Sequence, residues 1–524
     1  MRRKHLLTAV GAVVIALVSV TGLSAASFGL GPLVQVSNTS PFAADCDNYV
    51  DQTGTAFLNS EVEPWIDVNP TNPLNMIGVW QQDRWSNGGS RGLLAGVTTD
   101  GGANWTIGGD LTTSLCTGGT PQNGGGYQRA TDPWVTFGPT GVAYQLSLSF
   151  NDVEPPLTIF DFDHALLASR SLDGGLTWID LAPVIRDTAP TVFNDKQSIT
   201  ADPTDEDYVY AVWDRLVFPG SERASVQAAF RTSSFSGPTW FARSEDAGET
   251  WKPAQEIYDP GQRDQTIGNQ IVVQPTGPLV NIFTEFNNEN AKKRRGGFIR
   301  VLRSTDKGST WSGPFDVGRL GTIGNFDPEN GDPVRTGDII PDIAVDSTTT
   351  ATSGRLYAVW QDASLNGGQV DAIAFSQSLD GGVSWSKPIK VNKTPTGVPI
   401  GNQQAFTASV DVSADGTVSV TYYDFRNNTD EPPLLTDYFV AHCHPTSATA
   451  CLNPANWKDD LPGDDRRLTE VSFDMRKAPF AGGFFTGDYE GLANAGNGFT
   501  PFFSQPHGSG ATSDPASVFF RRAG

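Results

Sequence analysis

One eight-residue pattern recurs five times along the chain, and it limits the fold more than any other feature of the sequence. The pattern is Ser/Thr-x-Asp-x-Gly-x-(Thr/Ser/Asn)-Trp, and its copies are at 98–105, 171–178, 244–251, 304–311 and 378–385. Its aspartates are 73, 73, 60 and 74 residues apart, at Asp100, Asp173, Asp246, Asp306 and Asp380. Such a regular spacing predicts one supersecondary unit repeated along the chain.

The residue types of the pattern suit a tight turn between two strands. An aspartate carboxylate accepts hydrogen bonds from backbone N–H groups of a turn, and glycine adopts a positive φ without steric cost. The tryptophan can bury its rings between neighbouring sheets. We therefore interpret all five aspartates as structural residues, not as catalytic groups.

Pairs of strand patterns accompany these turns. An alternating strand is followed by a turn and by a second strand that often ends in Trp or Tyr. The pairs are at 64–69 with 76–80, 132–137 with 142–146, 198–202 with 208–213, 269–274 with 279–283, 341–346 with 355–360, 407–412 with 417–422, and 487–493 with 499–503. The last unit has only three strands, ending in 516–521, and residues 31–36 supply a fourth. We expect an all-β fold of seven four-stranded antiparallel units in a closed ring, with six units as the alternative.

The repeated pattern is the Asp-box, and the chain resembles the bacterial sialidases and other Asp-box (BNR-repeat) propellers. The resemblance extends through the repeats and implies a single β-propeller domain over 27–524. Sialidases usually have six blades, so seven is a departure from them. They also carry an early Phe/Tyr-Arg-Ile-Pro segment that supplies an active-site arginine, whereas this chain has Glu63-Pro64-Trp65 at the nearest position. The resemblance therefore covers the fold but not the catalytic signature.

The first 26 residues have the features of an export signal. Arg2, Arg3 and Lys4 precede an uncharged apolar stretch at 6–23 and small residues at 24–26. We expect cleavage near Ala26 and a secreted, extracellular chain without stable membrane insertion. An uncleaved anchor is the alternative, because the apolar stretch is at the short limit of a membrane span.

Four cysteines, an even number in an exported chain, predict two disulfides. Cys443 and Cys451 are close in sequence and would close a local loop. Cys46 and Cys116 would then pair and tie the N-terminal segment to the first repeat.

The charge of the chain limits its partners. The formal net charge is −22, and removal of a signal with three positive and no negative charges makes it −25. A field of this sign repels polyanions, so we expect no nucleic-acid partner. Few histidines are present, and we expect no cofactor and no metal, although the acidic side chains offer oxygen ligands for a structural calcium ion. We expect a monomer that acts on a glycan or glycoconjugate.

Arginines recur on the face of the ring opposite the Asp-box turns. In sialidase-like propellers the active site lies on that face, around the central channel. Arg84, Arg215 and Arg426 each follow the second strand of a unit. Together they would clamp a carboxylate by bidentate hydrogen bonds, or each would pair with a neighbouring aspartate. Further candidates for substrate binding are Arg129 and Arg335, and we interpret the basic run at 292–295 as a solvated loop.

Acidic side chains enter the same face near the starts of the first strands. They are Glu63, Asp67, Asp132, Asp195, Asp338, Asp342, Asp488 and Glu490. The resemblance implies a tyrosine nucleophile assisted by a glutamate, with an aspartic acid as general acid/base. Tyr489 and Tyr423 are the candidate nucleophiles, with Asp132 and Glu490 as catalytic acids and Glu63, Asp195, Asp342 and Asp488 as substrate-binding groups. Tyr489 and Glu490 are adjacent on a strand, so their side chains point to opposite faces and we expect no direct pair.

Three functions follow from these residues. A sialidase-type exo-glycosidase, our first choice, requires arginines, a tyrosine and an acid in one pocket. A non-catalytic propeller that binds glycans or proteins requires aromatic and carboxamide side chains, for which Asn269, Gln270, Gln403 and Gln404 are candidates. The third is a metal-dependent enzyme or a calcium-stabilised scaffold.

Overall fold

A computed structural model of the chain describes residues 28–47, 52, 54–151, 163–189, 191–218, 236–288, 295–458, 465–507 and 513–524. The expected export signal and residues 292–294 of the basic run lie outside the described residues. Within them, the regular structure consists of β-strands and short 3-10 turns, which confirms the all-β class. No helix of the described residues is long and apolar enough to cross a membrane.

Most strands pair antiparallel in groups of four that follow the order of the chain. A bridge between Ser90 and Ala130 and a parallel pairing of the first group with the last join three of these groups into one sheet. The first three groups are β2 (Ala56–Val68), β3 (Met76–Trp85), β4 (Ser90–Thr98) and β5 (Thr106–Ile107); β6 (Arg129–Phe137), β7 (Ala143–Phe150), β8 (His164–Ser171) and β9 (Ile179–Asp187); and β10 (Val192–Ala201), β11 (Val209–Val217), β12 (Thr239–Ser244) and β13 (Gln255–Tyr258). The next three are β14 (Gln265–Val273), β15 (Leu279–Asn287), β16 (Gly296–Ser304) and β17 (Ser312–Leu320); β20 (Asp342–Val345), β21 (Leu356–Asp362), β22 (Ala372–Ser378) and β23 (Ile389–Lys390); and β24 (Ala405–Val412), β25 (Val418–Asp424), β26 (Leu435–Cys443) and β27 (Arg466–Arg467).

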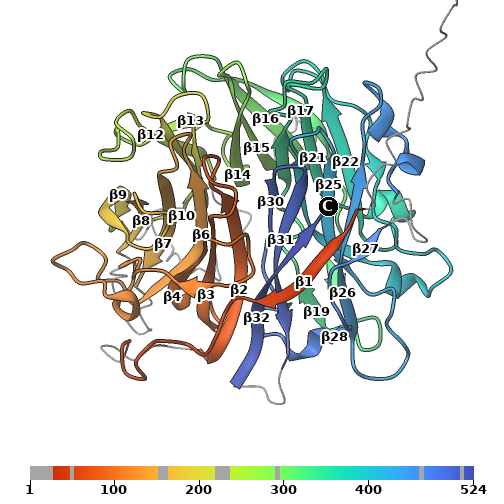
Figure 1. The fold of residues 1–524 in the computed structure, drawn as a ribbon, viewed down its shortest axis with the longest axis horizontal. Helices are drawn as coiled ribbons and strands as arrows, with labels where there is room; N and C mark the ends of the chain where they lie inside the picture. The colour runs from red at the N-terminus through yellow and green to blue at the C-terminus, as the bar shows by residue number, and fades with distance from the viewer. Residues whose placement is uncertain are drawn as a thin grey trace, which may run out of the picture.

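The last group joins the two ends of the described chain. It consists of β30 (Gly491–Ala495), β31 (Gly498–Pro506), β32 (Ser513–Ala523) and β1 (Leu30–Gln35). β1 pairs antiparallel with β32, so that Leu33 lies opposite Arg521 and Gln35 opposite Phe519. Figure 1 shows this contact between the red and the blue end of the chain.

Small elements lie in the connections between the groups. They are β18 (Asn325–Phe326), β19 (Pro333–Arg335), β28 (Phe473–Asp474) and β29 (Phe484–Phe485), with the 3-10 turns η1 (Leu115–Thr117), η2 (Ala363–Asn366), η3 (Ile400–Gln403), η4 (Ala450–Leu452), η5 (Pro454–Asn456) and η6 (Met475–Lys477). β19 and β29 pair in parallel, which holds the connections 321–341 and 468–490 together.

The hydrophobic core lies between neighbouring groups. The first strands are neighbours in the cycle β2, β6, β10, β14, β20, β24, β30 and again β2. Trp80, Trp213 and Trp360, near the ends of three second strands, are at most 1% exposed. Trp213 of β11 packs in one cluster with Leu146 of β7. Each sheet is therefore stabilised by burying its face against the next sheet.

The five Asp-box turns share one set of hydrogen bonds. In each, the aspartate Oδ1 accepts the backbone N–H four residues later, at 2.8–3.0 Å. The Ser or Thr two residues before it donates to the same oxygen. The box glycine has a positive φ in every copy, between 80° and 99°. Trp311 packs edge to face on Phe241 of the preceding group, at 5.4 Å, so the turn also anchors the contact between sheets.

Removal of one of these carboxylates should weaken the protein slightly. Asp380 accepts from the Ser378 hydroxyl and from the N–H groups of Val383 and Ser384. We expect Asp380→Ala to lower the Tm by about 2 °C, because these bonds lie in an exposed turn. Thermal unfolding measures this, with Asp430→Ala at an exposed position as the control. An Asp380→Ala protein that unfolds like the control would contradict the structural role.

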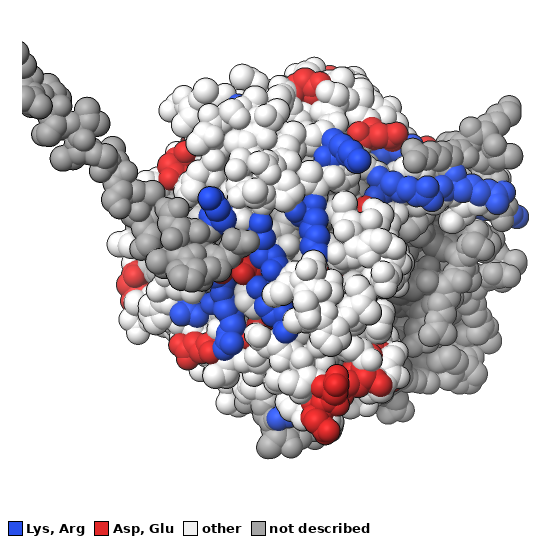
Figure 2. Space-filling model, turned by 90° about the vertical axis from the view of Figure 1, so that its right-hand side faces the viewer, with Lys and Arg blue, Asp and Glu red and all other residues white. Residues whose placement is uncertain are grey.

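Two disulfides join Cys46 to Cys116 and Cys443 to Cys451, which confirms the expected pairing. The first fixes the segment before β2 against η1, and Arg91 reinforces it through a paired contact with Asp47, 2.9 Å from each carboxylate oxygen. Figure 2 shows that lysine and arginine side chains gather near the middle of one side of the molecule, although the chain is acidic. The negative charge is therefore unevenly distributed.

Five of the first strands carry a β-bulge at one equivalent position. The antiparallel register shifts between Val62 and Trp65, Thr131 and Trp134, Asp195 and Ser198, Ile267 and Gln270, and Phe406 and Ser409. Each bulge holds one residue at positive φ, namely Glu63 (52°), Asp132 (50°), Lys196 (49°), Gly268 (71°) and Thr407 (48°). This conformation costs a residue with a Cβ on the order of 1 kcal/mol or more, and the bulges redirect these side chains towards the centre of the molecule.

Candidate functional site

A pocket of about 330 Å³ opens near the bulges. Its wall includes the turn between β3 and β4 at 86–89, whereas the Asp100 turn is at the far end of β4. The pocket therefore lies on the face away from the Asp-box turns. Its charged lining consists of Glu63, Arg84, Asp132, Asp195, Lys196, Arg335, Asp338 and Asp488, and its apolar lining of Leu148, Phe150, Phe193, Ile267, Ile339 and Ile340.

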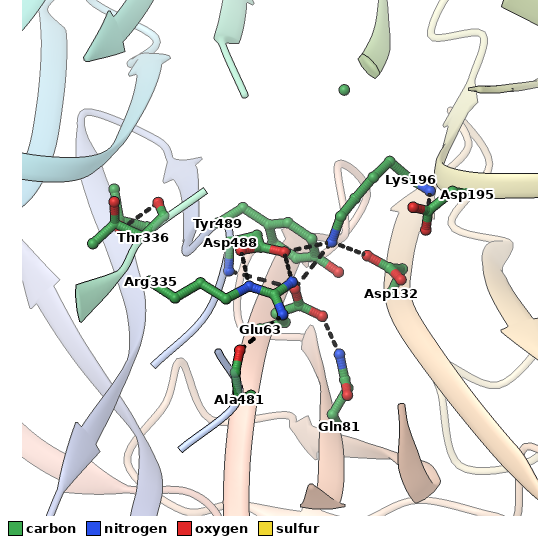
Figure 3. Close-up of polar contacts among 12 residues, drawn as sticks. Glu63, Gln81, Asp132, Asp195, Lys196, Arg335, Thr336, Ala481, Asp488 and Tyr489 are labelled. Atoms are coloured by element: carbon green, nitrogen blue, oxygen red, sulfur yellow. Dashed lines mark hydrogen bonds and ion pairs between the residues drawn. The ribbon is translucent and has the colours of Figure 1, made fainter. Parts of the chain in front are cut away.

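Lys196 is the centre of the charged lining. Its Nζ lies 2.6 Å from Asp132 Oδ1, 2.8 Å from Asp488 Oδ2 and 3.2 Å from Glu63 Oε1. Figure 3 shows the lysine side chain extending from β10 towards these three carboxylates. An ammonium group has three protons to donate, so the three acceptors saturate it. Three segments distant in sequence are thereby joined at one nitrogen.

The two pocket arginines differ in their partners. Arg335 donates two hydrogen bonds to Asp488, one of them 2.9 Å long, and the two cations Arg335 and Lys196 lower the pKa of that buried carboxyl against the effect of burial. Arg84 donates to Gln81 Oε1 at 2.7 Å, and its buried Nε has no partner. Among the described carboxylates none forms an ion pair with Arg84, and burial lowers the pKa of its guanidinium. Arg84 therefore lines the pocket as a cation without a carboxylate partner among the described residues, and its guanidinium carbon lies 5.0 Å from the centroid of the Phe485 ring.

Two carboxyl groups of the pocket keep protons to unusually high pH. Burial, opposed by Lys196, raises the pKa of Glu63 to about 7. Burial and the neighbouring charge of Asp132 raise the pKa of Asp195 to about 7, again opposed by Lys196. Both carboxyl oxygens of Glu63 accept hydrogen bonds, one from Gln81 and the other from Lys196.

Asp132 and Asp195 each present one oxygen to the pocket. Asp195 Oδ1 accepts the N–H of Lys196 at 3.0 Å, and Asp132 Oδ1 accepts from Lys196 Nζ. Within the part of the chain that the structure describes, their second oxygens have no hydrogen-bond partner. The strands that carry them, β6 and β10, are neighbours. The pocket thus combines a carboxyl group that titrates near pH 7 with a carboxylate held in an ion pair.

Trp65, Trp134 and Tyr489 line a small cavity next to the pocket, and Lys196 and Asp488 line both. Trp65 and Trp134 stack with ring centroids 3.7 Å apart, and Tyr489 contacts Trp134 edge to face at 5.3 Å. Tyr489 donates to the Pro133 carbonyl at 3.1 Å, and burial raises the pKa of its hydroxyl well above the usual value. Trp65 and Trp134 also line a further hollow of about 230 Å³, together with Asp67, Asp342 and Asp411.

Three of the candidate arginines do not line the pocket. Arg215 pairs with Asp187 at 2.7 Å, and Arg426 pairs with Asp424 and Asp465. Of the two arrangements expected for Arg215 and Arg426, the structure thus shows the one in which each arginine pairs with its own aspartates. Arg129 donates to Asn87 Oδ1 and Gly88 O, so that it supports the 86–89 turn in the pocket wall.

Four other candidates have structural surroundings. Tyr423 donates to Ser504 O at 2.6 Å and lies 2.9 Å from Glu490 Oε1, and both residues are fully buried. Asp342 accepts the N–H groups of Ile343 and Val410, which joins β20 to β24. Gln404 bonds both backbone polar groups of Phe326. These four residues do not line the 330 Å³ pocket.

Lys196 is the main site residue that the sequence analysis did not include. In the sequence, Lys196 is a charged residue just before the part of β10 in which polar and apolar residues alternate. Glu63 in β2 and Asp132 in β6 have equivalent positions. An alignment of the first strands on their bulges would have found it.

Metal binding has little support among the described residues. The one group of three candidate ligands is Cys46, Asp47 and Cys116, and its two sulfurs form a disulfide. The pocket carboxylates hold Lys196 and Arg335 as their counter-cations. The structural calcium ion stays a prediction from sequence.

Comparisons with known proteins give only distant similarities. No protein-family model matches the chain, and no curated protein matches it. Among solved structures, a protein of unknown function from Dyadobacter fermentans has 12% identity and a TM-score of 0.41, with 90% of this chain and 98% of that chain covered. A Hadza microbial sialidase has 14% identity and a TM-score of 0.44, with 86% and 74% covered. An α-L-arabinanase from Penicillium chrysogenum has 11% identity and a TM-score of 0.44, with 75% and 94% covered. At these values no similarity establishes a family or an activity for this chain.

Proposed function

We propose that the chain is a secreted glycoside hydrolase that cleaves a glycosidic bond in the 330 Å³ pocket. The observation that carries this proposal is the pair of Asp132 and Asp195, each with one oxygen available to a ligand. Glycosidases need one carboxylic acid and one carboxylate beside the scissile bond. A raised pKa on one of two neighbouring carboxyl groups separates these two roles.

In the proposed mechanism Asp195 is the general acid. Its proton passes to the glycosidic oxygen while the bond between that oxygen and the anomeric carbon breaks. The Asp132 carboxylate either attacks the anomeric carbon, forming an ester that water then cleaves with ionised Asp195 as the base, or takes a proton from a water that attacks this carbon. Tyr489 is not the nucleophile in this proposal, because its hydroxyl donates to Pro133 O and has a strongly raised pKa.

The substrate is proposed to enter with a chain end. Beyond Lys196 and Asp488 the space continues only into a cavity of about 30 Å³ beside the stacked Trp65 and Trp134, which favours exo-cleavage. Arg84, with its buried unpartnered Nε, would bind an acceptor on the terminal sugar, such as a carboxylate or a hydroxyl oxygen.

We propose a seven-bladed β-propeller over 27–524, secreted after removal of 1–26. The cycle of neighbouring first strands and the β1–β32 pair support this blade number and a closed ring. The two disulfides fit an oxidising compartment.

The first test is hydrolysis of chromogenic glycosides by the purified chain. The panel contains an α-sialoside, an α-L-arabinofuranoside and common neutral pyranosides. We expect turnover of one class, with kcat/KM falling above about pH 7 as Asp195 loses its proton. Arg84→Ala should raise KM. A folded protein that cleaves neither these compounds nor natural oligosaccharides would contradict the proposal.

A glycan-binding propeller without catalysis is the second candidate. It is favoured by the ion pairs that already saturate Lys196 and tie Arg335 to Asp488. A glycan array that gives specific binding, together with wild-type chain that turns nothing over, would support this candidate instead.

A further inference from the structure

We propose that Lys196 is a positioning residue of the pocket: its ammonium gathers Glu63, Asp132 and Asp488 at one point and leaves the side chain of Asp195 outside this set of ion pairs. This inference rests on the proposed function for its kinetic consequence, but the charge arrangement itself can be tested without a substrate.

The three protons of the ammonium point to three carboxylate oxygens within 3.2 Å. Asp195, although adjacent in sequence, contacts only the backbone N–H of Lys196. The ammonium therefore pairs with carboxyl groups from β2, from β6 and from the segment before β30. It does not pair with the carboxyl group of Asp195, which lies on its own strand.

Lys196 has φ 49°, a conformation that glycine adopts more easily. The equivalent bulge of the next first strand, β14, does hold a glycine, Gly268 at φ 71°. A lysine at this position accepts a conformational cost, and its side chain is only 7% exposed. The interactions of the ammonium offset that cost.

Carboxyl groups outnumber cations around Lys196. Glu63, Asp132, Asp195 and Asp488 face it from three strands and one loop, Tyr489 lies with its ring 5.9 Å away, and Arg335 and Arg84 complete the charged lining. Without the ammonium, the ion pair of Arg335 with Asp488 would be the one left to these four carboxyl groups among the described residues. Mutual repulsion of like charges then favours protonation of more than one of them.

Three variants test the proposal. Lys196→Met keeps most of the apolar stem and removes the charge, and Lys196→Arg keeps the charge. Lys307→Met is a matched control, because Lys307 also has a positive φ (58°) and pairs with two aspartates, Asp202 and Asp205, but lies in an Asp-box turn.

The first readout is the pH dependence of unfolding, which needs no substrate. In Lys196→Met the clustered carboxyls gain protons in the folded state, so stability falls as pH rises from about 5 to 8. We expect its Tm to fall by about 5 °C more than that of the wild type over this range. Lys196→Arg and Lys307→Met should follow the wild-type slope. A Lys196→Met protein that is equally destabilised at pH 5 and pH 8 would overturn the proposal.

The second readout is the pH profile of kcat/KM on whichever glycoside the wild type cleaves. We expect the acidic limb of Lys196→Met to move to higher pH, because the clustered carboxylates lose their shared counter-cation. Lys196→Arg should restore the limb. An unchanged profile with lower overall activity would mean a purely structural lysine. Absence of any wild-type turnover would contradict the hydrolase, while the unfolding readout would still decide the role of Lys196.

Discussion

Asp195→Asn should lower kcat by about 10²–10⁴-fold on a substrate with a poor leaving group, because the amide has no proton of suitable acidity to transfer. The loss should shrink on a 2,4-dinitrophenyl glycoside, whose leaving group departs without protonation. In the wild type the acid is active while protonated, so kcat/KM should decline above about pH 7. In Asp195→Asn this decline should disappear. Steady-state kinetics from pH 4 to 9 measure both effects.

Asp338→Asn is the matched control for this variant. Asp338 lines the same pocket and burial raises its pKa, but the Thr322 hydroxyl donates to it at 2.8 Å. We expect its kcat to stay within a few-fold of wild type. Equal losses in the two variants, or an equal loss of Asp195→Asn on both leaving groups, would show that Asp195 is not the proton donor. Asp195→Asn should also be more stable than wild type at pH 8, since the wild type must ionise a buried carboxyl there.

Asp488→Ala should destabilise the protein by about 3–5 kcal/mol, because it leaves the buried Lys196 and the half-buried Arg335 without their shared partner. Asp488 accepts from Arg335 and Lys196, and its side chain is 6% exposed. Its lowered pKa means that the stabilisation is present above the unfolded pKa near 4 and is lost only in strong acid. Guanidinium unfolding at pH 7 measures the change in the free energy of unfolding.

An ion pair at the surface provides the control for the Asp488→Ala variant. Glu249 lies 2.9 Å from Arg170, but its side chain is 61% exposed. Solvent screens such a pair, so Glu249→Ala should change stability little. Similar effects in the two variants would contradict the view that the Asp488 network is strongly desolvated and required for folding.

The repeats made much of the architecture predictable. A turn with Asp, Gly and Trp at fixed offsets has few ways to fold, and all five copies form the same hydrogen bonds. The disulfides were predictable because two of the four cysteines, Cys443 and Cys451, are close in sequence, which leaves Cys46 and Cys116 as the other pair. The strand starts also placed Glu63, Asp132, Asp195 and Asp488 near one another, and these residues do line one pocket.

The partners of long side chains were less predictable. Arg84, Arg215 and Arg426 follow similar strands, yet their contacts are set by connections that differ between units. Asp187 and Asp465, which lie in or beside fourth strands, reach Arg215 and Arg426, whereas no described carboxylate reaches Arg84. The bulges were not visible either, because period-2 alternation gives no sign of a residue at positive φ. Lys196 was missed for that reason.

The pairing of β1 with β32 has a consequence for how the chain is made. Arg521 Nε donates to Gly31 O across 490 residues of sequence. During synthesis the first strand must therefore wait, without its partner, until the last strand has emerged. A chain in this state exposes a strand edge that can pair with other chains. We expect a dependence on holding chaperones during synthesis, and aggregation of products that lack 513–524.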